Sequence, residues 1–475
     1  MADGKKNSSL VTRKGMTENR QHPASFRDPA GFVFEQQGKY YRQINQSYAD
    51  NYVLFKQSGL YDLLVKERKI IPHTEINENL TGRPQWHITI LPQQLPFISY
   101  PYEWCFSQWK DAALLTLGLV QKGIDHGMIL KDATPFNIQF VNGLPVLIDS
   151  LSFEKYDATK PWVAYRQFVE CFIAPLLLAK YNGAAMLKIF QIYPDGIPLA
   201  VVLKLLPFKS ILNANVFLHV RLPNLLTAKK NDAQKKRVPF TRQKLINIIS
   251  NLGSFVQSLA LPPSVTQWNN YYEETILSRG YADAKMTIIE NWLKEMPGHT
   301  VLDIGTNTGL FAKAASAAGK FTIAIDGDTA CIDKLYTDCR QQNTGNIIPL
   351  CVDITNPSPA IGWDNAERAA FAERAKADTT MALALIHHLV IGKNISFEQV
   401  AGTFSRFSTW LIIEFVPKND PKVQLLLQDR EDIFTGYNEA AFLEAFEKKF
   451  MIIGRTVVPG TERAVFLMKL KNQAF

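Results

Sequence analysis

The sequence predicts an α/β protein in which a C-terminal half with a mostly parallel sheet follows a separate α+β half. Three observations carry this prediction. After about residue 266, apolar segments of strand length alternate with helical segments, as in a parallel sheet covered by helices. Before about residue 150, short strand-like segments surround one long apolar helix. Between the halves, Leu261-Pro262-Pro263-Ser264 has the composition of a linker.

The composition is that of a soluble globular protein large enough for two or three domains, because 47% of its 475 residues are hydrophobic and 20% are charged. The net charge is +8, and the clearest basic run spans residues 229–237. This run suits either an anionic partner or a solvated loop. The loop is favoured, since no aromatic residues interleave with the basic ones and no zinc or recognition-helix pattern lies beside them. We therefore expect no nucleic-acid partner.

The cysteines and the apolar runs indicate a cytoplasmic protein. The 5 cysteines contain no C-x-x-C pair, and such a small, odd number fits a reducing compartment. The first 15 residues lack the apolar core of a signal peptide. The longest apolar runs are too short to span a bilayer, so no membrane span is expected.

The first elements are read from periodicity and turn residues. Residues 1–28 are polar and are expected to form a disordered tail. The segment 31–44 alternates around Gly38 as a β-hairpin does. Residues 48–70 have helical periodicity that breaks near Ser58-Gly59, and residues 86–91 form a further strand candidate.

The next segments are a long helix, a hairpin and a helical region. An apolar helix is expected from about residue 104 to 123. Two short strands, 138–140 and 146–148, flank Asn142-Gly143, a dipeptide typical of tight hairpin turns. Residues 161 to about 260 are predicted to be mostly helical and apolar.

The motif VLDIGTNTGLFA, residues 301–312, predicts a buried strand, a glycine turn and a helix. Such a motif suits a dinucleotide or an S-adenosylmethionine fold. The dinucleotide fingerprint needs a middle glycine, so that the backbone can approach a pyrophosphate, and here Asn307 stands between Gly305 and Gly309. Asn tolerates left-handed backbone, so the turn itself is kept. Asp303 would repel a diphosphate and suits a cationic ligand.

Two further acids follow predicted strands. Asp326 ends the apolar run FTIAID, 23 residues after Asp303, and suits the two ribose hydroxyls of a nucleotide. Asp353 ends IIPLCVD, where its carboxylate can accept from an adenine amino group. One acid after each of three successive strands is more specific than the glycine motif alone.

On these motifs, residues from about 266 to 470 resemble a class I S-adenosylmethionine-dependent methyltransferase, which has a Rossmann-like fold. AIDGD and CVDI are similar to the family's second and third motifs, and MALALIHHL to its fourth-strand motif. The segment 411–434 resembles a subfamily that includes nodulation proteins. The resemblance implies S-adenosylmethionine as cofactor and no metal in this half; the alternative is a Rossmann-like domain that has lost its ligand.

Methyl transfer to a hydroxyl or ammonium group needs a base, and three residues are candidates. His387 and His388 follow the fourth strand, where the acceptor approaches in this fold. Either can instead cap a helix or satisfy a backbone group. Glu414 ends another apolar run and is also a candidate, although a structural ion pair is the favoured interpretation.

Residues 125–154 contain a second, separate constellation. Asp132 is followed five residues later by Asn137, and two short strands then lead to Asp149. Kinase chemistry needs one carboxylate that accepts the proton of a substrate hydroxyl. It also needs two oxygen ligands for the magnesium that binds the phosphates. Residues 31–240 thus resemble the protein-kinase and aminoglycoside-phosphotransferase superfamily, which implies Mg-ATP as a further ligand.

The kinase resemblance has departures. No glycine-rich loop is evident, and Arg42 stands where the nucleotide-binding lysine is expected. Leu130-Lys131-Asp132 and Asp149-Ser150-Leu151 replace the usual His-Arg-Asp and Asp-Phe-Gly. An active atypical kinase, a nucleotide-binding regulator and a substrate-holding scaffold all stay open.

The sequence therefore predicts methyl transfer from S-adenosylmethionine to a small-molecule or saccharide hydroxyl or amine. A bifunctional kinase-methyltransferase and a non-catalytic S-adenosylmethionine-binding protein are the alternatives. The acceptor and the oligomeric state are not indicated. The expected division is a tail over residues 1–28, a kinase-like domain over 29–240, a helix and linker over 241–265, and a methyltransferase domain over 266–475.

Overall fold

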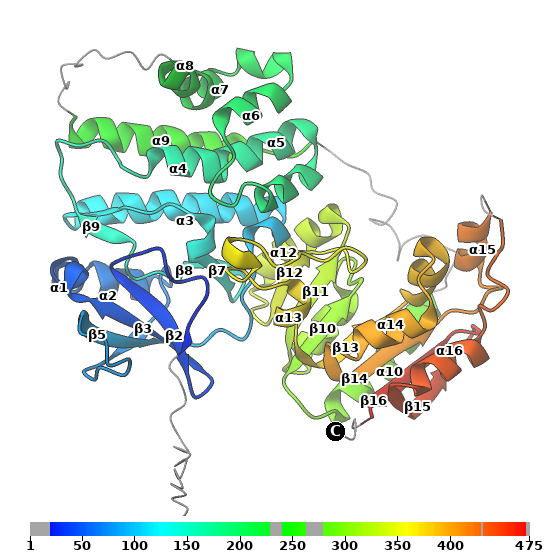
Figure 1. Ribbon diagram of the computed structural model, residues 1–475. Helices are drawn as coiled ribbons and strands as arrows, with labels where there is room; N and C mark the ends of the chain where they lie inside the picture. Colours follow the sequence, from blue (N-terminus) through cyan, green and yellow to red (C-terminus); the bar gives the residue numbers. More distant parts are fainter. Residues whose placement is uncertain (1–19, 229–239, 263–278, 429–430, 472–475) are drawn as a thin grey trace, which may run out of the picture.

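The computed structural model describes residues 20–228, 240–262, 279–428 and 431–471. In these ranges the chain forms an N-terminal half of small sheets and many helices, and a C-terminal half built on one 7-stranded sheet (Figure 1). The predicted α/β class is confirmed. The basic run 229–237 and the second half of the predicted linker, Pro263-Ser264, lie outside the described residues.

The N-terminal half begins with a 5-stranded antiparallel sheet in the order β1-β2-β3-β5-β4. The predicted hairpin around Gly38 is confirmed, since β2 pairs with β3. The predicted disordered tail is wrong for residues 20–28. In this segment β1 pairs with β2, and Arg27 contacts Glu367 at 3.0 Å. The strands are β1 (Arg20–Gln21), β2 (Gly31–Gln36), β3 (Lys39–Asn45), β4 (His73–Ile76) and β5 (Trp86–Pro92).

Helices and two short two-stranded sheets complete this half. Gly59 has a φ of 77° between α1 and α2, at the predicted break. Asn142 and Gly143, with φ of 51° and 71°, form the predicted turn between β7 and β8. The elements up to residue 155 are α1 (Ala49–Gln57), α2 (Leu60–Lys66), α3 (Phe106–Asp125), β6 (Met128–Leu130), β7 (Ile138–Val141), β8 (Leu144–Leu147) and β9 (Phe153–Lys155).

The following region is mostly helical, as predicted, and its apolar side chains pack on α3 in one large core. A small antiparallel sheet is thus followed by a larger helical part. No described helix has both the length and the apolar character required to cross a bilayer. The helices are α4 (Tyr165–Phe168), α5 (Ala174–Asn182), α6 (Leu199–Leu205), α7 (Ala214–Val216), α8 (Leu222–Ala228) and α9 (Arg242–Ser258).

The C-terminal sheet has the strand order β12-β11-β10-β13-β14-β16-β15. The first five of these strands are parallel to one another, whereas β16 is antiparallel to both β14 and β15. This order is that of the class I methyltransferase fold. The strands are β10 (Thr300–Ile304), β11 (Phe321–Asp326), β12 (Ile347–Cys351), β13 (Ala377–Ala382), β14 (Ser408–Phe415), β15 (Phe450–Val457) and β16 (Ala464–Leu470).

Helices connect the parallel strands, and one of them joins the two halves of the chain. The helix α12 packs against α3, and β7 and β8 lie beside it (Figure 1). The short 3-10 helix η2 (Pro101–Glu103) lies beside β12, which is one of the two edge strands of this sheet. The helices are α10 (Arg279–Glu295), α11 (Leu310–Ala317), α12 (Thr329–Gln342), α13 (Phe371–Arg374), α14 (Phe397–Phe404), α15 (Pro421–Leu427) and α16 (Glu439–Glu447).

Candidate active site

The glycine turn links β10 to α11 through left-handed backbone. Gly305, Asn307 and Gly309 have φ of 75°, 52° and 81°. Asn307 therefore takes the conformation expected from its sequence position. A Cβ on Gly309 would lie 2.3 Å from Cδ1 of Leu335, so a larger residue there would push the turn away from α12.

The three acids lie at the same end of the sheet, because β10, β11 and β12 are adjacent and parallel and each acid is at or near the carboxyl end of its strand. Asp303 lies within β10, Asp326 ends β11, and Asp353 follows β12 by two residues. Asp326 Oδ2 accepts from the backbone N–H of Asn307 at 2.8 Å. A Cβ on Gly327 would lie 3.6 Å from the Asp353 Cβ, so these acids are close neighbours.

Asp303 is a buried carboxylate that accepts a hydrogen bond from one side chain among the described residues. Thr306 Oγ1 donates to Asp303 Oδ2 at 2.6 Å, and Asp303 is 3% exposed. Burial, reinforced by the nearby Asp326, raises the pKa of Asp303 to about 6. Burial destabilises the ionised form of this carboxylate, and a cationic ligand would stabilise that form again.

The donors and acceptors at this end of the sheet fit S-adenosylmethionine. Burial also raises the pKa of Asp326, which carries two backbone N–H contacts, from Asn307 and Asp328. Asp353 Oδ1 accepts from the backbone and the hydroxyl of Thr355, at 2.8 and 2.7 Å. Three carboxylates beside a glycine turn suit a ligand that offers an ammonium group, ribose hydroxyls and an adenine amino group.

The two histidines follow β13 where the backbone is irregular. Ala384 has a φ of 51°, and a π-helical turn, η9 (His388–Gly392), begins at the second histidine. Such irregularities are frequent at functional sites. A Cβ on Gly305 would lie 3.2 Å from Cδ1 of Leu385, so this segment lies beside the glycine turn.

His387 is fully buried, and neither of its ring nitrogens has a hydrogen-bond partner among the described residues. Burial, with help from His388, Arg463 and Lys285, holds the pKa of His387 well below its ordinary value. Burial also lowers the pKa of His388, to about 4. Both imidazoles are therefore neutral near pH 7, and the lowered pKa makes each a weaker proton acceptor than a free imidazole. Their ring centroids lie 4.1 Å apart.

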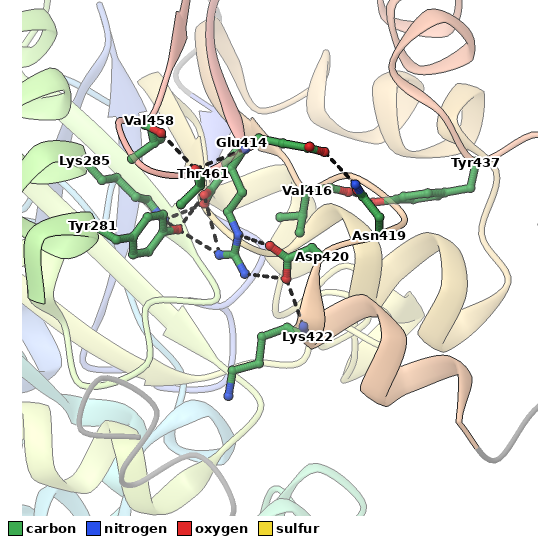
Figure 2. A network of polar contacts seen from close by, with 12 residues as sticks. Tyr281, Lys285, Glu414, Val416, Asn419, Asp420, Lys422, Tyr437, Val458 and Thr461 are labelled. Atoms are coloured by element: carbon green, nitrogen blue, oxygen red, sulfur yellow. Dashed lines mark hydrogen bonds and ion pairs between the residues drawn. The ribbon is translucent and has the colours of Figure 1, made fainter. Parts of the chain in front are cut away.

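Glu414 belongs to a buried polar network (Figure 2). Its Oε2 lies 2.5 Å from Lys285 Nζ, and its Oε1 accepts from the Tyr281 hydroxyl at 2.6 Å. Burial alone would raise the pKa of Glu414, but Lys285 and Arg463 hold it below its ordinary value. Both oxygens of Glu414 are thus engaged by protein groups, so the geometry supports the ion-pair interpretation.

Arg463 extends this network toward α15. Its Nε and one terminal nitrogen contact Asp420 at 2.7 and 2.9 Å, and its other terminal nitrogen donates to the Tyr281 hydroxyl at 2.8 Å. Sequence reasoning missed Tyr281, Lys285 and Arg463. The i, i+4 spacing of Tyr281 and Lys285 is the only signal that links two of them, and it is weak on its own.

The kinase-like triad comes together in the N-terminal half. Asn137 Nδ2 donates to Asp132 Oδ2 at 3.0 Å and to the Ser152 hydroxyl at 3.3 Å. That hydroxyl donates in turn to Asp149 Oδ2 at 2.9 Å. Burial, with the nearby Asp149, raises the pKa of Asp132.

Arg42, on β3, forms an ion pair with Asp149. Burial would raise the pKa of Asp149, but the Arg42 guanidinium and the donors Leu151 and Ser152 hold it below its ordinary value. The positive charge beside the Asp149 carboxylate therefore comes from the side chain of Arg42. The pair also ties the small sheet to the helical part.

Comparison with known proteins identifies one relative over nearly the whole chain. The nodulation protein NoeA of Rhizobium meliloti (strain 1021) is 31% identical over 454 residues, which cover 93% of this chain and 94% of NoeA. No protein-family model matches the chain.

Solved structures match about half of the chain or less. The N-methyltransferase NodS of Bradyrhizobium japonicum WM9 is 10% identical with a TM-score of 0.31, covering 41% of this chain and 98% of NodS. The bifunctional kinase-methyltransferase WbdD is 14% identical with a TM-score of 0.30, covering 46% of this chain and 45% of WbdD.

Proposed function

Because the chain belongs to the family of the nodulation protein NoeA and its C-terminal half has the class I methyltransferase strand order, we propose that it transfers a methyl group from S-adenosylmethionine. The observation that carries this proposal is the set of three carboxylates at the ends of three adjacent parallel strands. Asp303, Asp326 and Asp353 would hold the cofactor, with Gly305, Asn307 and Gly309 forming the turn beneath it.

When bound, the cofactor supplies an activated methyl group on a sulfonium. The chain's own contribution is to align an acceptor and to remove its proton. We propose His387 as the base, since it is buried, neutral and without a protein partner among the described residues. His388 is the second candidate, and Glu414 is assigned to the buried ion pair.

A base is needed for an acceptor hydroxyl or ammonium group, and we propose a small-molecule or saccharide acceptor of that kind. We also propose that the protein works in the cytoplasm. The five cysteines are all free and buried, which suits a reducing compartment. Residues 29–240 and 266–475 are proposed as the kinase-like and methyltransferase domains.

The convergence of Asp132, Asn137 and Asp149 favours one second candidate, a bifunctional kinase-methyltransferase with Mg-ATP as a further ligand. The ion pair between Arg42 and Asp149 weighs against it, because magnesium would have to displace a guanidinium. We therefore assign the N-terminal half a binding or scaffolding role. A protein that binds S-adenosylmethionine without catalysis is the third candidate.

Calorimetric titration of the full-length protein with S-adenosylhomocysteine tests the cofactor assignment. We expect binding by the wild type and its loss in Asp303→Ala. Lys313→Ala is the matched control, since Lys313 lies on the neighbouring helix α11 and, within the described residues, forms an ion pair with Asp338 alone. Normal S-adenosylhomocysteine binding by Asp303→Ala would refute the assignment. Binding without methylation of any acceptor in a cell extract would favour the non-catalytic candidate.

A further inference from the structure

Exposed apolar side chains gather in the helical part of the N-terminal half. Of the large hydrophobic side chains that are exposed among the described residues, six fall between residues 205 and 225. Phe208 and Leu212, at 86% and 88%, are the most exposed of all of them. Single exposed apolar side chains are ordinary, whereas a cluster marks an interaction surface. We call this cluster the apolar patch, and it consists of Leu205, Phe208, Leu212, Phe217, Leu218 and Leu225.

The apolar patch lies on short helical segments that pack together. Its residues come from α6, from the 3-10 helix η6 (Phe208–Leu212), from the π-helical turn η7 (Phe217–Arg221) and from α8. The segment η6 contacts α7, and η7 contacts α6 and α8 in spatial proximity or along the chain. Figure 1 shows α6, α7 and α8 together beyond α9 and α5, at the end of this half that is remote from the small sheet. The patch therefore lies away from the strands that carry the proposed cofactor site.

The exposure of the apolar patch does not reflect a missing core. In the same segments, Val202, Leu206, Val216 and Val220 are at most 9% exposed and belong to the main hydrophobic core. These segments thus bury one apolar face already, and the patch is a second apolar face that no described residue covers. Removing such side chains from water is favourable, so the patch gains free energy when a partner covers it.

The charges around the apolar patch have one sign. Residues 196–228 contain no Asp or Glu, whereas Lys204, Lys209 and Arg221 are cations. Lys204 and Lys209 are exposed. In the sequence, the basic run 229–237 follows α8 with five Lys or Arg residues and one acid. A partner that covers the patch would therefore meet positive charge without compensation nearby, so an anionic partner is favoured.

Cations and apolar side chains are interleaved in the patch. Lys209 directly follows Phe208, and Arg221 comes three residues after Leu218 and four before Leu225, a spacing that places side chains on one helical face. A membrane surface with anionic lipids has the matching chemistry, because its acyl chains receive apolar side chains and its headgroups attract Lys and Arg. Single-stranded nucleic acid is bound by aromatic stacking instead, yet four of the six patch residues are leucine.

We propose that the apolar patch docks this protein on the surface of a membrane that contains anionic lipids. The apolar side chains enter the boundary between headgroups and acyl chains, while Lys204, Lys209 and Arg221 stay at the level of the headgroups. Docking would bring the methyltransferase half close to acceptors held at that surface. It does not require methyl transfer, so the two proposals stand or fall separately.

The test is co-sedimentation of the full-length protein with vesicles of phosphatidylcholine and phosphatidylglycerol in equal parts, and with vesicles of phosphatidylcholine alone. We expect the wild type to bind the mixed vesicles, more weakly at high salt, and to bind phosphatidylcholine vesicles far less. Phe208→Ser/Leu212→Ser should lower the partition coefficient by at least about 10-fold, since both variants remove a large apolar side chain. Lys204→Gln/Lys209→Gln should lower it by about 5-fold for each charge removed.

Met451→Ser/Ile453→Ser is the matched control, because these two apolar side chains are 49% and 48% exposed on β15, in the other half of the chain. This control should bind the mixed vesicles as the wild type does. The melting temperature of Phe208→Ser/Leu212→Ser and its binding of S-adenosylhomocysteine should equal those of the wild type, since both replaced side chains are exposed.

Two results would overturn the docking proposal. One is wild-type protein that stays in the supernatant with the mixed vesicles, or that binds them no better than Phe208→Ser/Leu212→Ser does. The other is a wild type that is dimeric in analytical ultracentrifugation and binds no vesicles, with a monomeric patch variant, because a second copy would then cover the patch. If the wild type binds the vesicles but not S-adenosylhomocysteine, docking stands and the proposed methyl transfer falls.

Discussion

The ammonium nitrogen of Lys285 lies 2.5 Å from Oε2 of Glu414, and the two side chains are 3% and 0% exposed. Removing one partner of a buried pair leaves an uncompensated charge, which typically costs about 3–5 kcal/mol. We expect Lys285→Met to lower the free energy of unfolding by about that amount in chemical denaturation. Arg455→Met is the control, because the pair of Arg455 with Glu439 is exposed and should change stability by less than about 1 kcal/mol.

Asp303→Asn is expected to stabilise the ligand-free protein at pH 8. Burial raises the pKa of Asp303 to about 6 from 3.8, so its contribution to stability is present below pH 3.8 and is lost as the pH rises through 6. The shift corresponds to at most about 3 kcal/mol. Thermal unfolding at pH 5 and pH 8 should show a larger gain at pH 8. An equal effect at both values would contradict a raised pKa.

His387→Leu is expected to stabilise the fold by about 1–3 kcal/mol, because it removes two buried nitrogens that have no partner among the described residues. Burial lowers the pKa of His387, so wild-type stability should fall as the pH drops below 6.5, and less so in the variant. Denaturation curves from pH 7.5 to 5 measure both effects. Loss of methyl transfer with retained S-adenosylhomocysteine binding would support its role as the base. A destabilised variant would show that His387 has a structural partner instead.

Mg-ATP is expected to leave the melting temperature of the wild type unchanged, since Arg42 already neutralises Asp149. S-adenosylhomocysteine is the positive control: at about 100 times its Kd it should add roughly 2.7 kcal/mol. In Arg42→Ser, Asp149 loses its cation, and we expect a response to Mg²⁺ to appear. A wild-type shift with Mg-ATP that Asp149→Ala removes would establish a nucleotide site and favour the bifunctional candidate.

The sequence predicted those parts of the molecule that depend on local order along the chain. Asp303, Asp326 and Asp353 each follow an apolar strand, and parallel pairing then brings them to one end of the sheet. The left-handed backbone of Asn307 was likewise readable from its place between two glycines. The roles of these residues, and of Asp132, Asn137 and Asp149, stay predictions.

Contacts between segments that are distant in the chain could not be predicted from the sequence. Residues 20–28 are polar and looked like a tail, yet Arg27 pairs with Glu367, which is 340 residues away. The pairing of Arg463 with Asp420 depends on β16 being antiparallel to β14, and no local sequence pattern predicts that orientation. That Tyr102 and Asp353 line one cavity likewise depends on how the two halves of the chain pack together.

The strand β12 lies at an edge of the C-terminal sheet, and the N-terminal half covers it. All five residues of the strand are buried, and η2 lies beside it, with Cys105 and Cys351 packed in one cluster. An apolar edge strand stripped of its cover is a template for self-association. Residues 266–475 made alone would expose that edge and should aggregate. On this expectation, the N-terminal half keeps its neighbour soluble by covering β12, whatever its own chemistry.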